Sequence, residues 1–330
     1  MGVRKTVGRG LEATLGKERT SALRRAERRS RHKLAQRIAP PTPRAAGPAK
    51  SGKPQPVPAR PLGEPNDRQG GWIPSDPFVE HPRPSQSRHD LLRQLHDVLQ
   101  PRTYFEIGVN EGSSLTLSRT RSIAVDPEFR VTKPLYCDLE LVQAKSDEFF
   151  ERPDGLAHFE GTPIDLAFID GMHLSEFALR DFINLERHRD PASVAVFDDV
   201  LPRNGLEAAR VRLTGSWAGD VYKAVEIVAR RRPDLVVLHV NTGPTGTAVV
   251  VGADPTSSVL GDAFDEELAY LEAEDPQVPP LEYMSRSIAV DPGVLMASEA
   301  WPLLVSARED GDAEKLERAK GILRALPRLG

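Results

Sequence analysis

The sequence predicts an α/β fold, a doubly wound and mostly parallel sheet with helices on both faces. Short apolar stretches alternate with helical patterns between residues 87 and 252, which is typical of this class. A glycine turn directly follows an early apolar stretch within residues 104–114. Two later stretches, 234–240 and 247–252, are joined by only six turn residues. Because a parallel crossover needs about a dozen residues or more, this last pair is expected to be an antiparallel C-terminal hairpin.

The individual elements follow from the spacing of apolar residues along the chain. The first helix is expected to begin with Ser87 or Asp90 as its N-cap. Strands are expected at 104–106, 122–126, 139–146, 165–170, 193–199, 234–240 and 247–252. Helices are expected to open at 113–115 and 148–150, and to span 173–189, 217–232 and 315–326. Residues 255–330 have a mostly helical pattern throughout.

Composition divides the chain into three regions. Residues 1–60 carry 16 Lys and Arg against 3 Glu, and residues 40–84 are rich in Pro, Gly and Ser. We therefore expect a basic, Pro-rich, largely disordered tail and linker at 1–85, a folded domain at 86–254 and a helical C-terminal extension at 255–330. The tail is either a contact for RNA, an acidic partner or anionic lipid, or a solvated extension. The lack of aromatic residues among its charges favours the extension.

The bulk properties exclude several classes of protein. The net charge of −4 gives no overall attraction to nucleic acid, so a nucleic-acid partner is not expected. The single cysteine, Cys137, excludes an internal disulfide framework and a cysteine-based zinc site. The sequence has no apolar run of the length that crosses a bilayer, and its N-terminus lacks the apolar core of a secretory signal. These features predict a cytoplasmic protein.

The glycine turn has the composition of a ligand cradle. Gly108 and Gly112 allow the backbone to approach a ligand closely, and Glu106 at the strand end suits a ligand with hydroxyl or ammonium donors. The spacing Glu-x-Gly-x-x-x-Gly differs from the dinucleotide fingerprint Gly-x-Gly-x-x-Gly. Asp126 ends the next strand, where doubly wound folds hold a ribose diol. The alternative is an ordinary surface turn, with Asp126 capping a helix.

Together, this turn and Asp126 resemble motif I and the following acidic motif of class I S-adenosylmethionine-dependent methyltransferases. The resemblance implies a Rossmann-like methyltransferase fold with a seven-stranded sheet and one reversed strand. It also implies S-adenosylmethionine as the cofactor, with the methionine part at the turn, the ribose at Asp126 and the adenine at Ser146 and Asp147. Asp147 is equally a candidate helix N-cap. The cofactor-binding residues implied are Glu106, Gly108, Asn110, Gly112, Ser113, Asp126, Ser146 and Asp147.

Three further carboxylates lie at the ends of two apolar strands. Asp170 ends one strand, and Asp198 and Asp199 end the next. If the strands are neighbours, the carboxylates converge in the ligand crevice and need a cation to offset their repulsion. Oxygen ligands without cysteine select Mg²⁺, Mn²⁺ or Ca²⁺ rather than Zn²⁺. The alternative is that Asp170 begins a turn and the Asp198–Asp199 pair caps a helix.

His173 follows Asp170 by three residues, so it is expected to project into the same crevice. A histidine with its ordinary pKa of about 6.5 can accept a proton at neutral pH, which makes His173 the candidate general base. A solvent-exposed helix cap is the alternative. Lys223 either neutralises an acidic acceptor group or pairs with Asp220.

The pattern Asp170-Gly171-Met172-His173, followed by Asp198-Asp199, resembles a second and narrower group. This group comprises the metal-dependent sugar O-methyltransferases of the macrocin and mycinamicin type, and the related cephalosporin-hydroxylase-like proteins. The resemblance covers about residues 103–252 and implies that the three acids bind Mg²⁺ and that His173 is the base. It implies a transferase acting on a hydroxylated small molecule, a sugar above all, and allows a homo-oligomer.

Two other functions stay open at this point. One is a non-catalytic protein that binds S-adenosylmethionine or nothing, and uses the basic tail to contact nucleic acid or a protein partner. The other is a nicotinamide oxidoreductase, which the missing second glycine of the fingerprint and the terminal hairpin disfavour.

Overall fold

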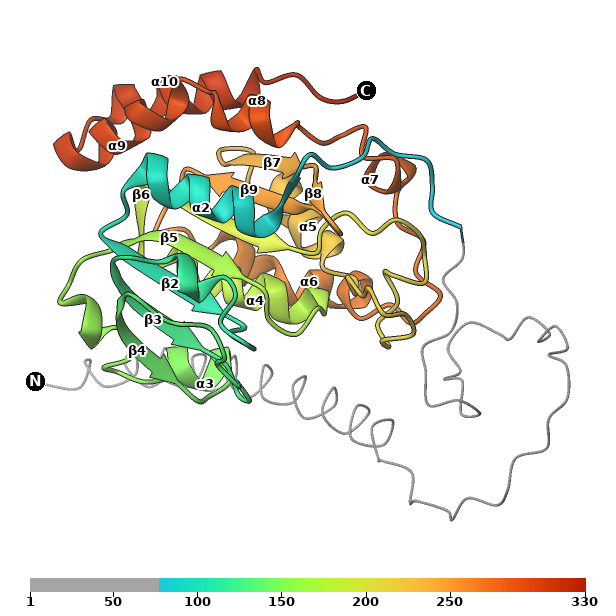
Figure 1. Ribbon diagram of the computed structural model, residues 1–330, viewed down its shortest axis with the longest axis horizontal. Helices are drawn as coiled ribbons and strands as arrows, with labels where there is room; N and C mark the ends of the chain where they lie inside the picture. Colours follow the sequence, from blue (N-terminus) through green and yellow to red (C-terminus); the bar gives the residue numbers. More distant parts are fainter. Residues whose placement is uncertain (1–76) are drawn as a thin grey trace, which may run out of the picture. The chain divides into compact units, whose positions relative to one another are not determined.

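The computed structural model describes residues 77–330, all of which lie within one compact unit (Figure 1). The predictions for residues 1–76, which include the basic tail and most of the linker, lie outside the described residues. Among residues 77–330, no helix is both long enough and apolar enough to span a membrane.

The core of the described part is a seven-stranded sheet with the order β4-β3-β2-β5-β6-β9-β7. All neighbouring strands are parallel except β9, which runs antiparallel to both β6 and β7. The strands are β2 (Thr103–Ile107), β3 (Arg121–Val125), β4 (Asp138–Val142), β5 (Ile164–Ile169), β6 (Arg189–Asp198), β7 (Val236–Val240) and β9 (Thr247–Val251). The predicted fold class, with its reversed strand in a closing hairpin, is confirmed.

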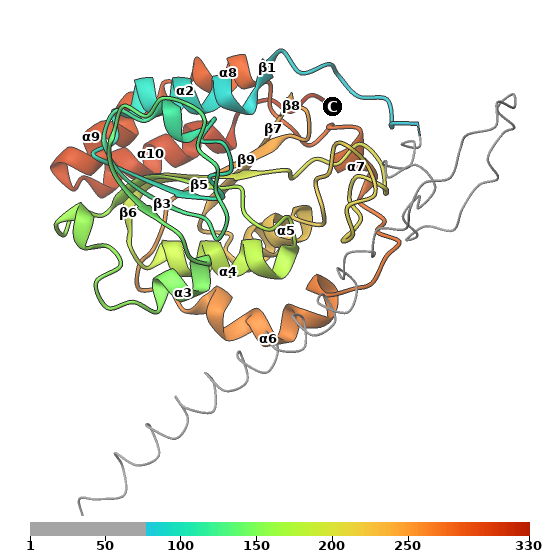
Figure 2. The same ribbon diagram turned by 60° about the horizontal axis from the view of Figure 1, so that its bottom comes forward.

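Helices cover both faces of this sheet, as Figure 2 shows. One face carries α3 (Ser146–Phe150), α4 (Ser175–Glu186), α5 (Tyr222–Arg231) and α6 (Val259–Leu271). The other carries α2 (Arg88–Leu99), α8 (Pro292–Met296), α9 (Ala300–Asp310) and α10 (Ala313–Arg324). Successive strand residues point to opposite faces, so Phe105 packs in one hydrophobic cluster and Tyr104 in the other. Both faces are therefore buried, which explains why these strands read as continuous apolar runs.

Short elements complete the described chain. They are β1 (Gln86–Ser87), η1 (Leu115–Leu117), η2 (Ala157–Phe159), β8 (Thr242–Gly243) and α7 (Leu281–Met284). Strand β1 pairs in parallel with β8, which joins the start of the folded chain to the β7–β9 turn. Ser87 then caps α2 in a reciprocal capping box with Asp90, so Ser87 is the N-cap of the predicted first helix.

Several predicted helix starts are wrong. The helix expected at 113–115 is only the single 3₁₀ turn η1, which ends at Ser118, where the backbone becomes extended. Helix α4 begins at Ser175 rather than at His173, whose φ of 55° is left-handed and incompatible with a helix. Helix α5 begins at Tyr222 rather than at 217.

The third predicted strand and the following helix also shift. Strand β4 ends at Val142, four residues before the predicted end, and α3 already begins at Ser146. Lys145 occupies the N-cap position of α3 without a side-chain hydrogen bond. Asp147 therefore lies in the first turn, where an acid is favourable to the helix dipole, and is not the N-cap.

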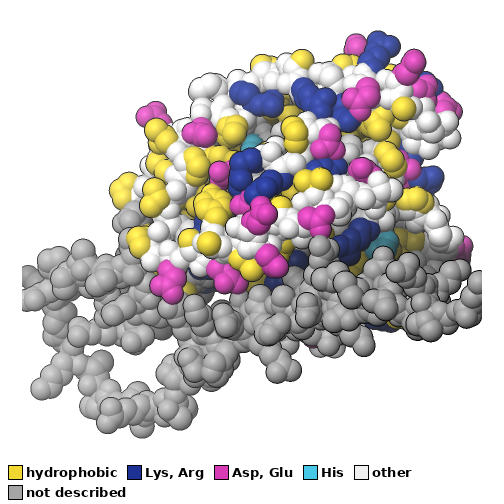
Figure 3. All heavy atoms as spheres, turned by 180° about the vertical axis from the view of Figure 1, so that it is seen from behind, with side chains coloured by type: hydrophobic (Ala, Val, Ile, Leu, Met, Phe, Trp, Pro, Cys, Tyr) yellow, Lys and Arg dark blue, Asp and Glu magenta, His cyan; other side chains and the backbone are white. Residues whose placement is uncertain are grey.

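The surface drawn in Figure 3 mixes charges of both signs. On this face, Lys and Arg side chains alternate with Asp and Glu and with hydrophobic groups. The described atoms in this view form no extended basic surface of the kind that binds nucleic acid.

Candidate active site

The glycine turn after β2 brings two strand ends together. Gly108 has a φ of +89°, and a Cβ at this position would lie 1.8 Å from the carbonyl oxygen of Asp170. Only glycine permits this approach, because any side chain would overlap the backbone that follows β5. The turn and Asp170 consequently lie at the same edge of the sheet, where the parallel strands end.

Asp126 fixes the shape of the turn. Its Oδ2 accepts hydrogen bonds from the backbone amides of Val109 (2.8 Å) and Asn110 (2.9 Å), and its Oδ1 accepts one from Glu128 (2.6 Å). The carboxylate is buried at the end of β3, as predicted, and it caps a turn rather than a helix. Since Oδ1 accepts a single hydrogen bond, it retains a lone pair for a further donor.

Glu106 lies beneath the turn rather than on its surface. The side chain is fully buried, with Oε2 accepting a hydrogen bond from the Tyr104 hydroxyl (2.6 Å) and Oε1 accepting one from the Ser114 hydroxyl (2.8 Å). Burial raises the Glu106 pKa to about 8, although these two hydrogen bonds oppose the shift. At neutral pH the group therefore retains its proton and supports the turn as a neutral acid.

The other predicted cofactor residues divide into two groups. Asn110 and Ser113 stay in the turn, Asn110 exposed and Ser113 half-buried. The β3–β4 loop covers the turn, because the amide of Arg130 donates to the carbonyl of Asn110 (2.9 Å). Ser146 and Asp147 instead bind α4: Ser146 hydrogen-bonds Asp181, and Asp147 Oδ2 accepts from Arg180 (2.8 Å).

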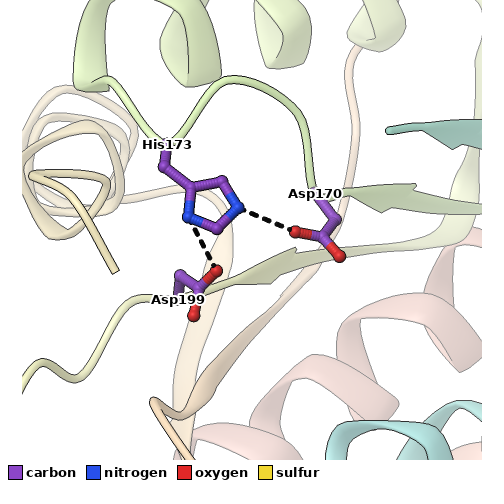
Figure 4. A group of neighbouring side chains, drawn as sticks. All are labelled: Asp170, His173 and Asp199. Atoms are coloured by element: carbon purple, nitrogen blue, oxygen red, sulfur yellow. Dashed lines mark hydrogen bonds and ion pairs between the residues drawn. The ribbon is translucent and has the colours of Figure 1, made fainter. Parts of the chain in front are cut away.

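Three of the remaining predicted residues meet in one cluster, shown in Figure 4. Asp170, His173 and Asp199 each offer an atom to a group in which all ligand atoms lie within 4.8 Å of one another. Asp170 follows β5 and Asp199 follows β6, and these neighbouring strands are parallel. Two of the three acids that were expected to converge therefore lie together, with the imidazole between the two carboxylates.

His173 is held on three sides. Its Nδ1 lies 2.9 Å from the Trp217 carbonyl oxygen and 3.1 Å from Asp199 Oδ2, and its Nε2 lies 3.2 Å from Asp170 Oδ1. The ring also stacks on the Trp217 indole, with centroids 5.0 Å apart. Because a carbonyl oxygen only accepts, Nδ1 carries a proton and Nε2 is the nitrogen that exchanges one. Burial lowers the His173 pKa, but Asp199 and Asp170 outweigh burial and raise it to about 9.

Asp198 lies next to this cluster but pairs with a different group. Its Oδ2 is 2.7 Å from Nη1 of Arg88, and Nη2 of Arg88 lies 3.9 Å from Asp170 Oδ2. Burial, followed by repulsion from Asp199 and Asp170, raises the Asp198 pKa well above its ordinary value. The three acids thus face two cationic side chains, Arg88 and His173.

Arg88 is the residue that sequence reasoning missed. It is the first residue of α2, directly after the N-cap Ser87. A cation at this position is opposed by the helix dipole, so a compensating acid had to lie nearby. That unusual placement is the signal in the sequence that could have identified Arg88.

A second network positions the loops around the cluster. Lys223 Nζ donates to Asp220 Oδ2 (3.1 Å), so Lys223 pairs with Asp220, one of the two roles expected for it. Asp220 Oδ1 also accepts from the backbone amide of Ser175 (2.9 Å), which fixes the start of α4 just after His173. Thr245, in the β7–β9 turn, donates its hydroxyl to Asp199 Oδ1.

Residues 105–200 match the model of a family described as a methyltransferase domain. This part of the chain is therefore similar to a methyltransferase domain. The match includes the glycine turn, Asp126 and the acids Asp170, Asp198 and Asp199, so the resemblance to class I methyltransferases is confirmed over these residues. No curated protein matches the sequence.

Several solved structures resemble the methyltransferase domain distantly. The O-methyltransferase TomG from Streptomyces achromogenes, in complex with SAM, is 17% identical over 51% of this chain and 80% of its own, with a TM-score of 0.38. An O-methyltransferase from Bacillus cereus, in complex with SAH, is 16% identical over 50% and 80%, with a TM-score of 0.37. MycE from the mycinamycin biosynthetic pathway, in complex with Mg, SAH and mycinamycin VI, is 17% identical over 50% and 48%, with a TM-score of 0.34. At these scores the likenesses decide nothing about the cofactor or the acceptor of this chain.

Proposed function

We propose that this protein is an S-adenosylmethionine-dependent, divalent-metal-dependent O-methyltransferase that acts on a hydroxyl of a sugar or glycoside-like small molecule. One observation carries the proposal: Asp170, His173 and Asp199 converge at the sheet edge where the glycine turn also ends. A methyl donor at the turn and an acceptor hydroxyl at the cluster would then be neighbours. The Asp-Gly-Met-His and Asp-Asp pattern supports the sugar as acceptor.

The turn fits the proposed cofactor. Gly108 and Gly112 let the turn pack closely on Asp170 and on Val131 of the β3–β4 loop, and Asp126 Oδ1 has a lone pair for a ribose hydroxyl. Asn110 and Ser113 would complete the methionine side, while the neutral Glu106 keeps the turn in shape from below. S-adenosylmethionine, when bound, supplies an electrophilic methyl group and its own leaving group, so no nucleophilic side chain is needed.

The cluster fits a divalent cation by its charge and its donors. Asp170 and Asp199 meet there with His173, and Asp198 lies beside them. Burial raises the pKa values of Asp198 and Asp199, as does repulsion from neighbouring carboxylates, which a bound cation would relieve. Asp170, Asp198 and Asp199 would hold Mg²⁺, or Mn²⁺ or Ca²⁺, through oxygen ligands. A cation held there would supply Lewis-acid activation of an acceptor hydroxyl.

His173 would then act as the general base. Its pKa is high because of Asp199 and Asp170, so neutralising these carboxylates would lower the pKa towards its ordinary range. Nδ1 keeps its proton on the Trp217 carbonyl, which leaves Nε2 to take the proton from the acceptor. Stacking on Trp217 holds the ring in this orientation.

One observation favours a different function, a non-catalytic binding or scaffold protein on the same fold. Arg88 and His173 already provide two positive charges for the three acids, so the cluster is partly neutralised by the chain itself. A site that is only structural would have this property. The two functions differ in one respect: only the enzyme transfers a methyl group to an acceptor.

The test uses the purified full-length chain. Calorimetry measures S-adenosylmethionine binding, and a panel of glycosides is screened with labelled donor and Mg²⁺ for methyl transfer. The enzyme is supported if Asp199→Asn abolishes methyl transfer and Asp97→Asn does not. Asp97 is an exposed residue of α2 and serves as the control. Cofactor binding without transfer to any glycoside favours the scaffold, and no cofactor binding contradicts the enzyme.

A further inference from the structure

A cavity of about 340 Å³, wide open to solvent, lies where the β1 segment meets the β7–β9 turn. Its walls are the segment 83–87 with His81 on one side, and Arg203, Gly243 and Pro244 on the other. This volume is within the range of small-molecule sites in proteins. None of the residues that line the cavity is among the predicted catalytic, cofactor-binding or metal-binding residues.

The cavity and the acid cluster share their supporting chain. Ser87 in the cavity wall precedes Arg88, which pairs with Asp198. Pro244 in the opposite wall precedes Thr245, whose hydroxyl binds Asp199. The parallel pairing of β1 with β8 ties the two walls together at Ser87 and Gly243. The walls of the cavity are therefore continuous in the chain with residues that bind Asp198 and Asp199.

A buried guanidinium supports one wall of the cavity. Arg286 is fully buried, and its Nη1 donates to Asn241 Oδ1 (2.6 Å) and to the Thr242 carbonyl (3.0 Å), while Nη2 donates to the Pro244 carbonyl. Its Nε has no hydrogen-bond partner, and no carboxylate among the described residues forms an ion pair with it. A buried charge that is held only by neutral groups leaves a positive potential around it.

Two more cations face the cavity from its walls. Arg83 is exposed, and within the described residues it has neither an ion pair nor a hydrogen bond. Arg203 is different, because it pairs with Glu207 and stacks on Phe78 with its guanidinium 3.8 Å from the ring centroid. The uncompensated charge at the cavity is therefore positive and comes from Arg83 and Arg286.

We propose that this cavity binds an anionic group of the methyl acceptor, a carboxylate or a phosphate, and that Arg83 contacts it. The inference rests on the proposed function and specifies its substrate class as an acidic sugar or glycoside. The opposite charges of cavity and cluster would orient such an acceptor, with its acid group at Arg83 and its hydroxyl at the three carboxylates. Arg286 fixes the wall at Pro244 and adds to the positive potential without contacting the ligand.

The experiment compares matched glycosides on the full-length protein in the presence of S-adenosylhomocysteine. Calorimetry at low salt measures the binding of 4-nitrophenyl glucuronide, 4-nitrophenyl glucoside and 4-nitrophenyl glucoside 6-phosphate. We expect the carboxylate or the phosphate ligand to bind about tenfold more tightly than the neutral glucoside. Whichever of the two acids binds more tightly identifies the preferred group.

Variants of single arginines distinguish binding in the cavity from a general attraction of acidic ligands to the protein surface. Arg83→Gln is expected to remove most of the preference for the acid, Arg83→Lys to retain part of it, and Arg93→Gln to leave it unchanged. Arg93 is an exposed arginine on α2 outside the cavity walls. Equal affinity for acidic and neutral ligands, binding of neither, or a preference that survives Arg83→Gln overturns the proposal.

Failure of this proposal and failure of the proposed function give different results. If neutral glycosides are methylated as well as acidic ones, the enzyme stands and the acidic acceptor is wrong. If S-adenosylmethionine does not bind, or no glycoside of either kind is methylated, the proposed function fails.

Discussion

The glycine turn and the acid cluster lie at the same edge of the sheet but hold their acids in different ways. In the turn, Asp126 is bound by backbone amides and Glu106 by two hydroxyls, so neither needs an ion. In the cluster, the acids form ion pairs with Arg88 and His173. The stability of this arrangement therefore depends on the charges of these side chains. The turn is therefore a fixed scaffold, whereas the cluster responds to any added cation. Each prediction below tests this difference.

The largest effect is expected from Asp199→Asn. Removing one carboxylate from the cluster should lower the rate of methyl transfer by about a thousandfold, because both a cation ligand and a partner of His173 are lost. S-adenosylmethionine affinity should change by no more than about twofold, since the turn is untouched. Rates with labelled donor and calorimetry measure the two quantities. Parallel losses of binding and rate would show that turn and cluster are one unit.

Gly108→Ala should break the turn without touching a charge. The new Cβ would overlap the Asp170 carbonyl at 1.8 Å, so we expect a loss of about 3 kcal/mol or more in the free energy of unfolding. Gly161→Ala is the matched control, because Gly161 has a φ of +80° and no neighbouring atom within 4 Å. Its cost should be only about 1 kcal/mol. Urea unfolding compares them, and equal costs would contradict the close approach of turn and Asp170.

Glu106 should make stability fall as pH rises. Its pKa is about 8 in the folded protein and near 4.5 when unfolded, so the folded state binds more protons between these values. Wild-type stability should therefore decrease from pH 5 to pH 8, and Glu106→Gln should reduce this decrease by a few kcal/mol. Urea unfolding at several pH values gives the slopes. Identical slopes would show that Glu106 is ionised within the fold.

The smallest effect is expected from Arg88→Gln. Arg88 pairs with Asp198 and approaches Asp170, so it competes with a divalent cation for the same acids. Its removal should raise Mn²⁺ affinity about tenfold, with Arg93→Gln unchanged as the control. Calorimetry with Mn²⁺ alone measures this directly. A weaker affinity in Arg88→Gln would mean that Arg88 helps to build the cation site instead.

The fold was largely predictable because most strands are buried on both faces of the sheet. Such strands consist of consecutive apolar residues, which are easily recognised in a sequence. The antiparallel hairpin followed from the length of one turn, and the edge at which Asp170 and Asp199 meet followed from strand order. Helix starts were less predictable. The left-handed φ of His173 depends on neighbours such as Trp217 and Asp220, which are distant in sequence.

The partners of the site residues were the least predictable feature. Arg88 and Asp198 lie 110 residues apart, and their pairing arises only when α2 packs beside the end of β6. The cavity depends in the same way on β1 joining β8 across the fold. The sequence shows which charged residues are present. Which of them form ion pairs depends on the contacts of the folded chain.

The central claim is that the cluster works with a divalent cation to methylate a hydroxyl. The most direct measurement is methyl transfer to a glycoside substrate before and after chelation of the full-length enzyme with EDTA. We expect transfer to stop in EDTA and to return when excess Mg²⁺ or Mn²⁺ is added, while S-adenosylmethionine stays bound. Undiminished transfer in EDTA would contradict the account.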